Sequence, residues 1–112
     1  MTIARAPARC MGMGLRRGPR AAVVLDVTLI RRRGGPVAGH TEDLATEGAR
    51  VVVDRPLAVD EQLHFNLACP GGRVDGTARV VRQQRPDCYA LRFEALDAPS
   101  VALIDDALSR TQ

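Results

Sequence analysis

Apolar and polar residues alternate along most of the chain, and this period of two is typical of half-buried β-strands. The first alternating run starts at Ala21 and places Val or Leu at every second position from Val23 to Leu29. Charged residues and chain breakers, Arg31-Arg32-Arg33-Gly34-Gly35-Pro36, end this run. Further runs that predict strands cover residues 37–42, 49–54, 63–68, 73–82 and 87–94.

The period changes near the C-terminus. Asp97 precedes Pro99, an arrangement that favours a helix N-cap followed by proline in the first turn. Val101, Ile104 and Leu108 then recur at spacings of three and four residues, which places them on one helical face. Six short strands and a helix predict a small antiparallel barrel or sandwich, with the apolar face of the helix covering an open end or side.

Length and composition narrow the class further. With 112 residues, of which 46% are hydrophobic, the chain is expected to fold as one domain. No apolar run exceeds five residues, so neither a membrane-inserted segment nor a secretory signal is predicted. Three widely spaced cysteines do not suggest a disulfide framework, and a cytoplasmic location is expected. These cysteines are Cys10, Cys69 and Cys88.

The charges are unevenly distributed. The chain has sixteen Arg, no Lys and thirteen acidic residues, for a net charge of +3. Residues 1–40 carry +7 and residues 41–112 carry −4. The excess in the N-terminal third indicates contact with an anion, which could be nucleic acid, lipid, a nucleotide or a protein, although a solvated Arg-rich tail would look the same. Residues 1–15 show no period and are predicted to be a flexible arm preceding a domain at 16–112.

The sequence does not predict an enzyme. The phosphate-binding loop of nucleotide hydrolases requires a Lys, which the chain lacks. Gly12, Gly14 and Gly18 resemble a glycine-rich loop, but no predicted strand precedes them. His40 and His64 lack the paired spacing of a metal site, so no metal is expected. No nucleophile motif is present either.

A nucleic-acid-binding arm is an alternative. The basic residues of the N-terminal third could neutralise phosphates, and binding would then weaken steeply with salt and disappear on deletion of residues 1–20. Sheets that bind single strands, however, rely on exposed aromatic residues for stacking. The aromatic residues here alternate with polar ones and are predicted to belong to the core, which makes nucleic acid a weaker candidate; they are Phe65, Tyr89 and Phe93.

Two short motifs lie at the predicted strand boundaries. Arg16-x-x-x-Arg20 precedes the first strand, and Asp43-x-Ala45-x-x-Gly48 ends the second. They resemble the RxxxR and (D/N)xSxxG signatures of the PilZ family. The resemblance extends over about residues 16–110, because the motif order, the six-strand layout, the late Tyr-x-Leu-x-Phe strand and the closing helix also agree. It implies a six-stranded antiparallel β-barrel with a C-terminal α-helix.

The resemblance also implies a function. Members of the family are non-enzymatic receptors for the bacterial second messenger cyclic di-GMP, a dianion with two guanines. By the family pattern, Arg16 and Arg20 contact phosphate and guanine with help from Arg17, because guanidinium groups form paired hydrogen bonds with both. Asp43 is then expected to accept hydrogen bonds from guanine, and Gly48 to leave room for the base. Signalling through a protein partner is expected, and no cofactor other than the ligand.

One position departs from the family pattern. The family Ser is Ala45 here, which removes a hydroxyl and thus a hydrogen bond of about 0.5–1.5 kcal/mol. Some family members have lost the ligand and act as protein adaptors. The sequence therefore leaves an adaptor that keeps only the barrel as the first alternative to a cyclic di-GMP receptor, and the nucleic-acid-binding arm as the second.

Overall fold

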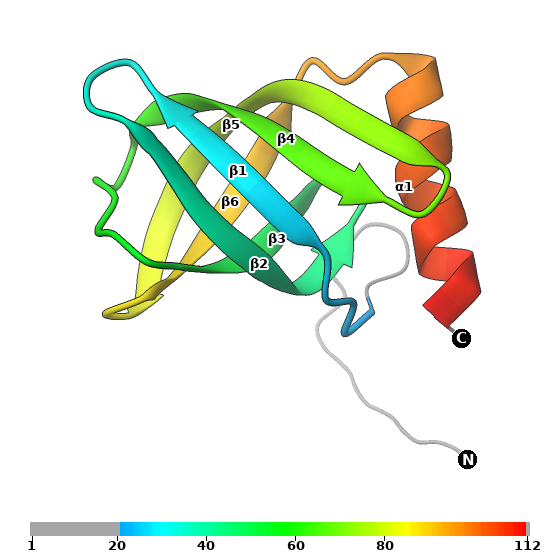
Figure 1. The fold of residues 1–112 in the computed structure, drawn as a ribbon, viewed down its shortest axis with the longest axis horizontal. Helices are drawn as coiled ribbons and strands as arrows, with labels where there is room; N and C mark the ends of the chain where they lie inside the picture. Colours follow the sequence, from blue (N-terminus) through cyan, green and yellow to red (C-terminus); the bar gives the residue numbers. More distant parts are fainter. Residues whose placement is uncertain (1–20, 112) are drawn as a thin grey trace.

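The described part of the chain, residues 21–111 of a computed structural model, forms a closed antiparallel β-barrel with an α-helix at one end (Figure 1). This confirms the predicted fold class and decides for a barrel over a sandwich. The strands follow one another around the barrel in the order β1-β2-β3-β6-β5-β4. Their bounds are β1 Asp26–Arg31, β2 Pro36–Ala45, β3 Gly48–Val53, β4 Gln62–Cys69, β5 Gly72–Arg85 and β6 Cys88–Glu94, and the helix is α1 Ala98–Thr111.

The first strand begins later than the alternation predicts. β1 starts at Asp26, and residues 21–25 run beside the end of β2 without joining the ladder. The buried hydroxyl of Thr41 holds this segment, because its Oγ1 donates to the carbonyl of Val23 and accepts from the N–H of Leu25 at 2.9 Å. The inward face was nevertheless predicted correctly, since Val23 is buried together with Val27 and Leu29 of β1.

The fifth strand is longer than predicted. The sequence indicated a break at residues 83–86, but β5 continues to Arg85 before a tight turn into β6. Its pairing with β6 shifts register twice, between Val80 and Arg82 and again between Gln83 and Arg85. Such bulges let a strand bend without ending, so the polar residues that suggested a loop remain in the strand as exposed positions.

The core is aliphatic with a small aromatic cluster. Phe65 and Tyr89 are buried, and Phe93 packs partly buried against the core, as predicted for all three. The rings of Phe65 and Phe93 stack with centroids 4.7 Å apart. Burial of large aromatic side chains supplies much of the stability that a core of Val, Leu and Ala would otherwise lack.

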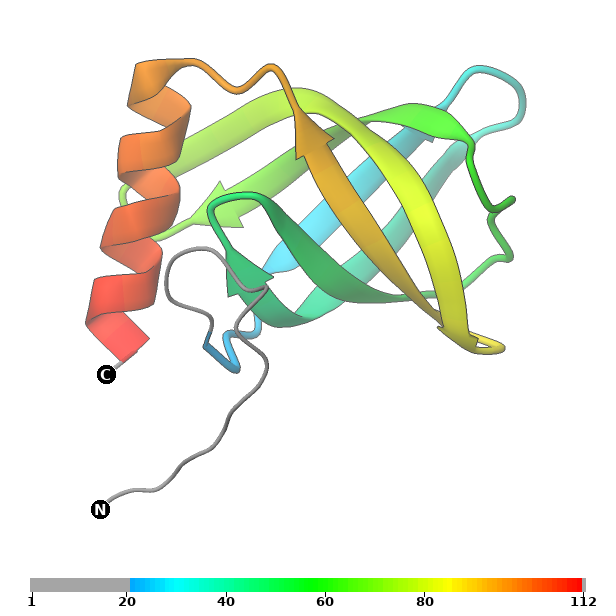
Figure 2. The same cartoon turned by 180° about the vertical axis from the view of Figure 1, so that it is seen from behind.

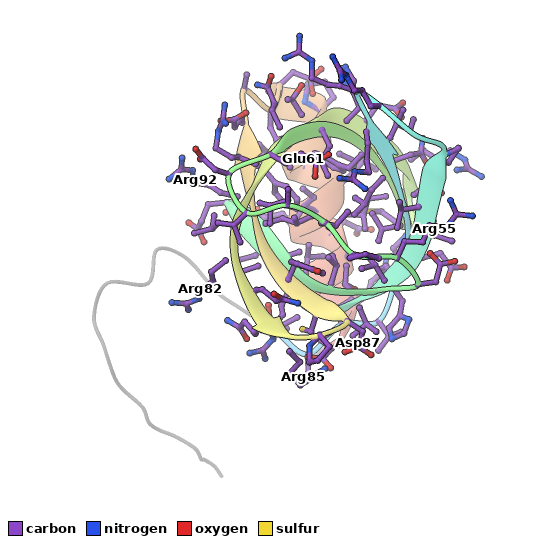
Figure 3. The ribbon with its side chains drawn as sticks, turned by 90° about the vertical axis from the view of Figure 1, so that its left-hand side faces the viewer. Arg55, Glu61, Arg82, Arg85, Asp87 and Arg92 are labelled. Carbon is purple, nitrogen blue, oxygen red and sulfur yellow. The ribbon has the colours of Figure 1, made fainter. Side chains whose placement is uncertain are left out.

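Helix α1 closes one end of the barrel. Asp97 caps it as predicted, because its Oδ1 accepts the N–H of Ser100 at 2.9 Å. Ile104, Ala107 and Leu108 are buried, and the helix packs against β2, β4 and β5. A view from the opposite end shows α1 behind the barrel (Figure 3). Among residues 21–111, no helix has the length and apolar character that crossing a bilayer requires.

Candidate functional site

The predicted Asp-x-Ala-x-x-Gly motif forms the β2–β3 hairpin. Asp43 and Ala45 are among the last three residues of β2, next to the turn, and Gly48 is the first residue of β3. Ala45 pairs directly with Gly48 across a two-residue turn. Gly48 also pairs with Arg92, so the hairpin lies beside the end of β6. The hairpin is on the side of the barrel where helix α1 lies (Figure 2). The structure therefore brings the three motif positions together at the rim of the barrel, as the sequence predicts.

A bulge in β2 lets two consecutive carboxylates contact the same arginine. The pairing of β2 with β3 shifts register between Thr41 and Asp43, so Glu42 is the extra residue. In a regular strand, neighbouring side chains point to opposite faces, whereas a bulge re-aims them. As a result both carboxylates reach one guanidinium: Glu42 Oε1 lies 3.3 Å from Arg50 Nε, and Asp43 Oδ2 lies 2.9 Å from Arg50 Nη2.

Arg50 of β3 orients the Asp43 carboxylate at both oxygens. Besides the ion pair to Oδ2, the backbone N–H of Arg50 donates to Asp43 Oδ1 at 3.2 Å. The Asp43 side chain is 16% exposed, so it is shielded from bulk water but remains accessible at the rim. Gln84 accepts a further hydrogen bond from Arg50 Nη1 at 3.0 Å, which ties this guanidinium to β5. Arg50 thus fixes the orientation of the Asp43 carboxylate.

Glu42 extends the charged network toward the β5–β6 turn. Its Oε2 accepts a hydrogen bond from Arg85, and this bond, together with the charges of Arg85 and Arg50, holds the pKa of Glu42 below its usual range despite the opposing effect of burial. The carboxylate therefore stays ionised at neutral pH. Sequence reasoning missed Glu42, Arg50 and Arg85, because their meeting depends on the bulge and on the register of three strands.

Gly48 is required by the backbone of the neighbouring strand. A Cβ at this position would lie 2.2 Å from the carbonyl oxygen of Leu91 in β6. The resemblance to the PilZ family implied that this glycine leaves room for a guanine base. The structure gives another reason, which is the close approach of β6, and the role toward a guanine base remains a prediction.

Ala45 is fully buried at the end of β2. Its methyl group is covered by the protein in the structure without ligand. A Ser hydroxyl at the same position would therefore need a hydrogen-bond partner within the barrel end or on a bound molecule, because an unsatisfied buried hydroxyl costs about 1–3 kcal/mol.

The segment that precedes β1 joins the barrel at the motif itself. Ala21 forms an antiparallel bridge with Leu44, the residue between Asp43 and Ala45. Its N–H donates to the Leu44 carbonyl at 3.1 Å, and its carbonyl accepts the N–H of Leu44 at 2.9 Å. The predicted arm at residues 1–15 and the predicted ligand contacts Arg16, Arg17 and Arg20 lie outside the described residues.

The comparisons with known proteins agree with this architecture. A family model for the PilZ domain matches residues 15–110. The solved PilZ domain of CeSA from a cellulose-synthesizing bacterium aligns with a TM-score of 0.64 and 18% identity, over 84% of this chain and 98% of that one. The Bacillus subtilis inhibitor of motility, MotI/DgrA, aligns with a TM-score of 0.74 and 19% identity over 88% of this chain and 52% of that one, so this chain spans about half its length. At these identities the structures show a shared fold. No curated protein matches the sequence.

Proposed function

The chain belongs to the PilZ domain family, a family of cyclic di-GMP receptors, and on this basis we propose that it is a cytoplasmic, non-enzymatic receptor for cyclic di-GMP. In this proposal the ligand binds between the Arg16-x-x-x-Arg20 motif and the β2–β3 hairpin. Occupancy draws the basic segment against the barrel, and the surface so formed is recognised by a protein partner.

The proposal is supported above all by the Ala21–Leu44 bridge. The bridge fixes the residue that directly follows Arg20 beside the residue that directly follows Asp43. Consecutive Cα atoms are about 3.8 Å apart, so each motif has a residue directly adjacent in the chain to one of the two bridged positions. An Arg side chain and a carboxylate that start from neighbouring points of the backbone can grip one planar ligand from two sides.

The chemistry of the two motifs matches the ligand. Guanidinium groups of Arg16, Arg17 and Arg20 can form paired hydrogen bonds with phosphate oxygens or with guanine O6 and N7, and can stack on a purine face. A carboxylate accepts about four hydrogen bonds, so the contacts of Asp43 with Arg50 are compatible with further donors from the guanine edge. Arg50 would keep the carboxylate in place before the ligand arrives, which lowers the cost of ordering it on binding.

Replacing the two motif arginines tests the proposal against a control supplied by the sequence. Arg5 and Arg9 have the same spacing as Arg16 and Arg20 but lie further from the barrel in the chain. By calorimetry at moderate salt, R16A/R20A is expected to weaken cyclic di-GMP binding by about a hundredfold or more, since two charge-assisted contacts are lost. R5A/R9A, with the same change in net charge, is expected to bind within about threefold of the wild type. Equal losses in both variants would show that only overall charge matters and would count against the site.

A second candidate is an adaptor that has kept the barrel and lost the ligand. It is favoured by Ala45, which lacks the family hydroxyl and is fully buried. If the chain is a receptor, Ala45→Ser is expected to strengthen cyclic di-GMP binding by up to about tenfold, because the restored hydroxyl gains a partner. If it is an adaptor, neither the wild type nor the A45S variant binds. Calorimetry on the two proteins, with thermal unfolding as a check on the barrel, separates these outcomes.

A further inference from the structure

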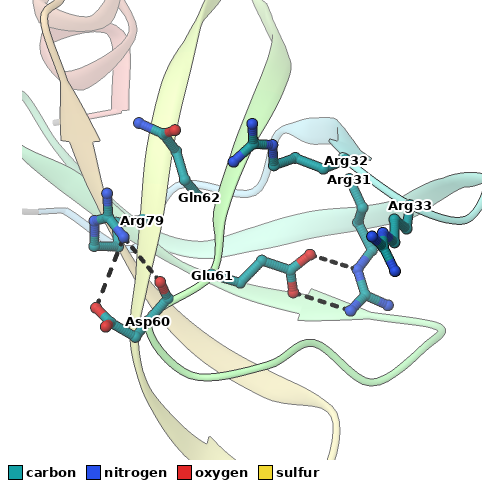
Figure 4. Close-up of a pocket in the computed structure, with 7 residues that line it drawn as sticks. All are labelled: Arg31, Arg32, Arg33, Asp60, Glu61, Gln62 and Arg79. Atoms are coloured by element: carbon teal, nitrogen blue, oxygen red, sulfur yellow. Dashed lines mark hydrogen bonds and ion pairs between the residues drawn. The ribbon is translucent and has the colours of Figure 1, made fainter.

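The Arg31-Arg32-Arg33 run has no role in the proposed receptor site. It lies where β1 ends, at the end of β2 opposite to Asp43 and Ala45. Along β2, nine residue steps at about 3.3 Å separate Pro36 from Ala45 by roughly 30 Å of strand. At this end the structure contains a pocket of about 730 Å³ (Figure 4), here called the distal pocket. Its lining consists of Arg31, Arg32, Arg33, Asp60, Glu61, Gln62 and Arg79.

Two of the four lining arginines are already neutralised. Arg31 forms a bidentate pair with Glu61, which directly precedes the neighbouring strand β4, with Nε–Oε2 2.7 Å and Nη2–Oε1 3.0 Å. Burial raises the pKa of Glu61, but hydrogen bonds from Arg31 and from the N–H of Ala58 outweigh it and lower the pKa. Arg79 contacts the Glu94 carboxylate at 3.2 Å and the Asp60 carbonyl at 2.9 Å. These pairs leave Arg31 and Arg79 with little charge to offer a ligand.

Arg32 and Arg33 are exposed and have no such partner. Among residues 21–111, neither forms a hydrogen bond or an ion pair. The lining as a whole has four guanidinium groups and two carboxylates, and thus a charge of +2. A ligand with two negative charges at separate positions would balance the charge of the distal pocket.

Three exposed aliphatic residues are connected to lining residues of the distal pocket through the backbone. Ile30, Val59 and Val81 are 47%, 56% and 45% exposed, and they are three of the four large hydrophobic side chains that are exposed in the described chain. Ile30 precedes Arg31 and Val59 precedes Asp60 in the sequence. Val81 follows Val80, whose carbonyl accepts the N–H of Asp60 at 2.7 Å. Apolar positions next to unpaired charges are typical of protein interfaces.

We propose that the distal pocket docks an acidic, partly apolar segment of a partner protein, with carboxylates on Arg32 and Arg33 and an aliphatic side chain against the Ile30–Val59 side. A peptide fits these features better than nucleic acid does. The lining has no aromatic side chain on which a base could stack. Exposed aliphatic residues directly precede two lining residues in the chain, and these suit an apolar side chain rather than a phosphate backbone. Because Arg32 and Arg33 are outside the proposed cyclic di-GMP site, this inference stands independently of that function.

Fluorescence anisotropy tests the proposal. A labelled peptide, in which each of two Glu pairs is followed by one Leu, is titrated with the full chain. The wild type is expected to bind it saturably, and R32A/R33A to bind about tenfold more weakly, at about threefold for each exposed charge pair. R82A/R110A is the matched control, because it removes two exposed arginines from β5 and α1 and leaves the distal pocket intact. This control should bind within about twofold of the wild type.

Three results would overturn the proposal. The first is an absence of saturable peptide binding up to about 1 mM. The second is an equal loss in the R32A/R33A variant and in the R82A/R110A variant, which would reduce the effect to net charge. The third is binding of a thymidine oligonucleotide, or of vesicles containing phosphatidylglycerol, that is tighter than peptide binding and is lost in R32A/R33A. The oligonucleotide result would assign the distal pocket to nucleic acid, and the vesicle result would assign it to a membrane surface. Cyclic di-GMP affinity measured on R32A/R33A is expected to equal that of the wild type, so the two proposals can fail separately.

Discussion

Asp43→Ala is expected to abolish measurable cyclic di-GMP binding, with a loss of at least about a hundredfold in affinity. The substitution removes the acceptor for the two guanine N–H donors, and hydrogen bonds to a charged group contribute about 1.5–3 kcal/mol each. Losing about 3 kcal/mol corresponds to a factor of more than about 100 in the dissociation constant. Titration calorimetry on the purified full chain measures this directly.

The control for Asp43 must separate recognition from folding, because the same carboxylate holds Arg50. Asp54→Ala removes an exposed carboxylate at the end of β3 and is expected to leave cyclic di-GMP binding within about twofold of the wild type. Asp43→Asn keeps one acceptor and much of the contact geometry, so the variant should fold and still bind poorly, since an amide N–H₂ opposes the guanine donors. Binding by a folded D43A variant within about threefold of the wild type would remove Asp43 from the site.

Gly48→Ala is expected to destabilise the barrel by about 3 kcal/mol or more. The new methyl group would lie 2.2 Å from the Leu91 carbonyl oxygen, and its three nearest atoms are all backbone atoms of β6, which pairs with β3. Relief would require β3 to separate from β6, which strains the hairpin that holds Asp43. For a domain of this size the melting temperature should fall by about 10 °C or more, as measured by circular dichroism.

Gly35→Ala provides the comparison for Gly48. A Cβ at Gly35 meets no atom within 4 Å, so this substitution in the β1–β2 turn is expected to change the melting temperature by no more than about 2 °C. If the G48A and G35A variants have the same melting temperature, the barrel accommodates the methyl group at position 48. The close approach of β6 would then not explain the glycine.

Local patterns were sufficient to predict most of the fold. Alternation gave the inward faces of the strands, and the Asp97 cap with the three- and four-residue spacing of Ile104 and Leu108 gave the helix. The errors fall where tertiary contacts override local pattern. Residues 21–25 alternate like a strand, but the Thr41 hydroxyl binds their backbone in place of a ladder. The polar residues before Pro86 resemble a loop, but bulges keep them within β5.

The candidate site was predictable only in part. The motif residues Asp43, Ala45 and Gly48 could be placed together because a short turn separates them in the chain. Arg50 could not be connected with Asp43 from the sequence, since that contact depends on where β2 bulges. The reason for Gly48 was equally hidden, because the atom that excludes a side chain belongs to β6, more than forty residues further along the chain.

The distal pocket shows the same limit. Its lining comes from the end of β1, from residues 60–62 at the start of β4 and from Arg79 of β5, which are far apart in the sequence. The Arg31-Arg32-Arg33 run indicated only charge at the end of a strand. The pairing of Arg31 with Glu61, which leaves the next two arginines without partners, became visible only once the barrel had closed.

Titration calorimetry of the wild-type chain with cyclic di-GMP, beside GMP and ATP at the same moderate salt concentration, tests the central claim most directly. The account predicts saturable binding of cyclic di-GMP at about micromolar affinity, and binding of GMP and ATP that is weaker by at least about tenfold. Both mononucleotides carry negative charge and a purine, but each has a single base and cannot engage the arginine motif and Asp43 together. Equal affinities for all three nucleotides, or no heat of binding with cyclic di-GMP, would contradict the claim.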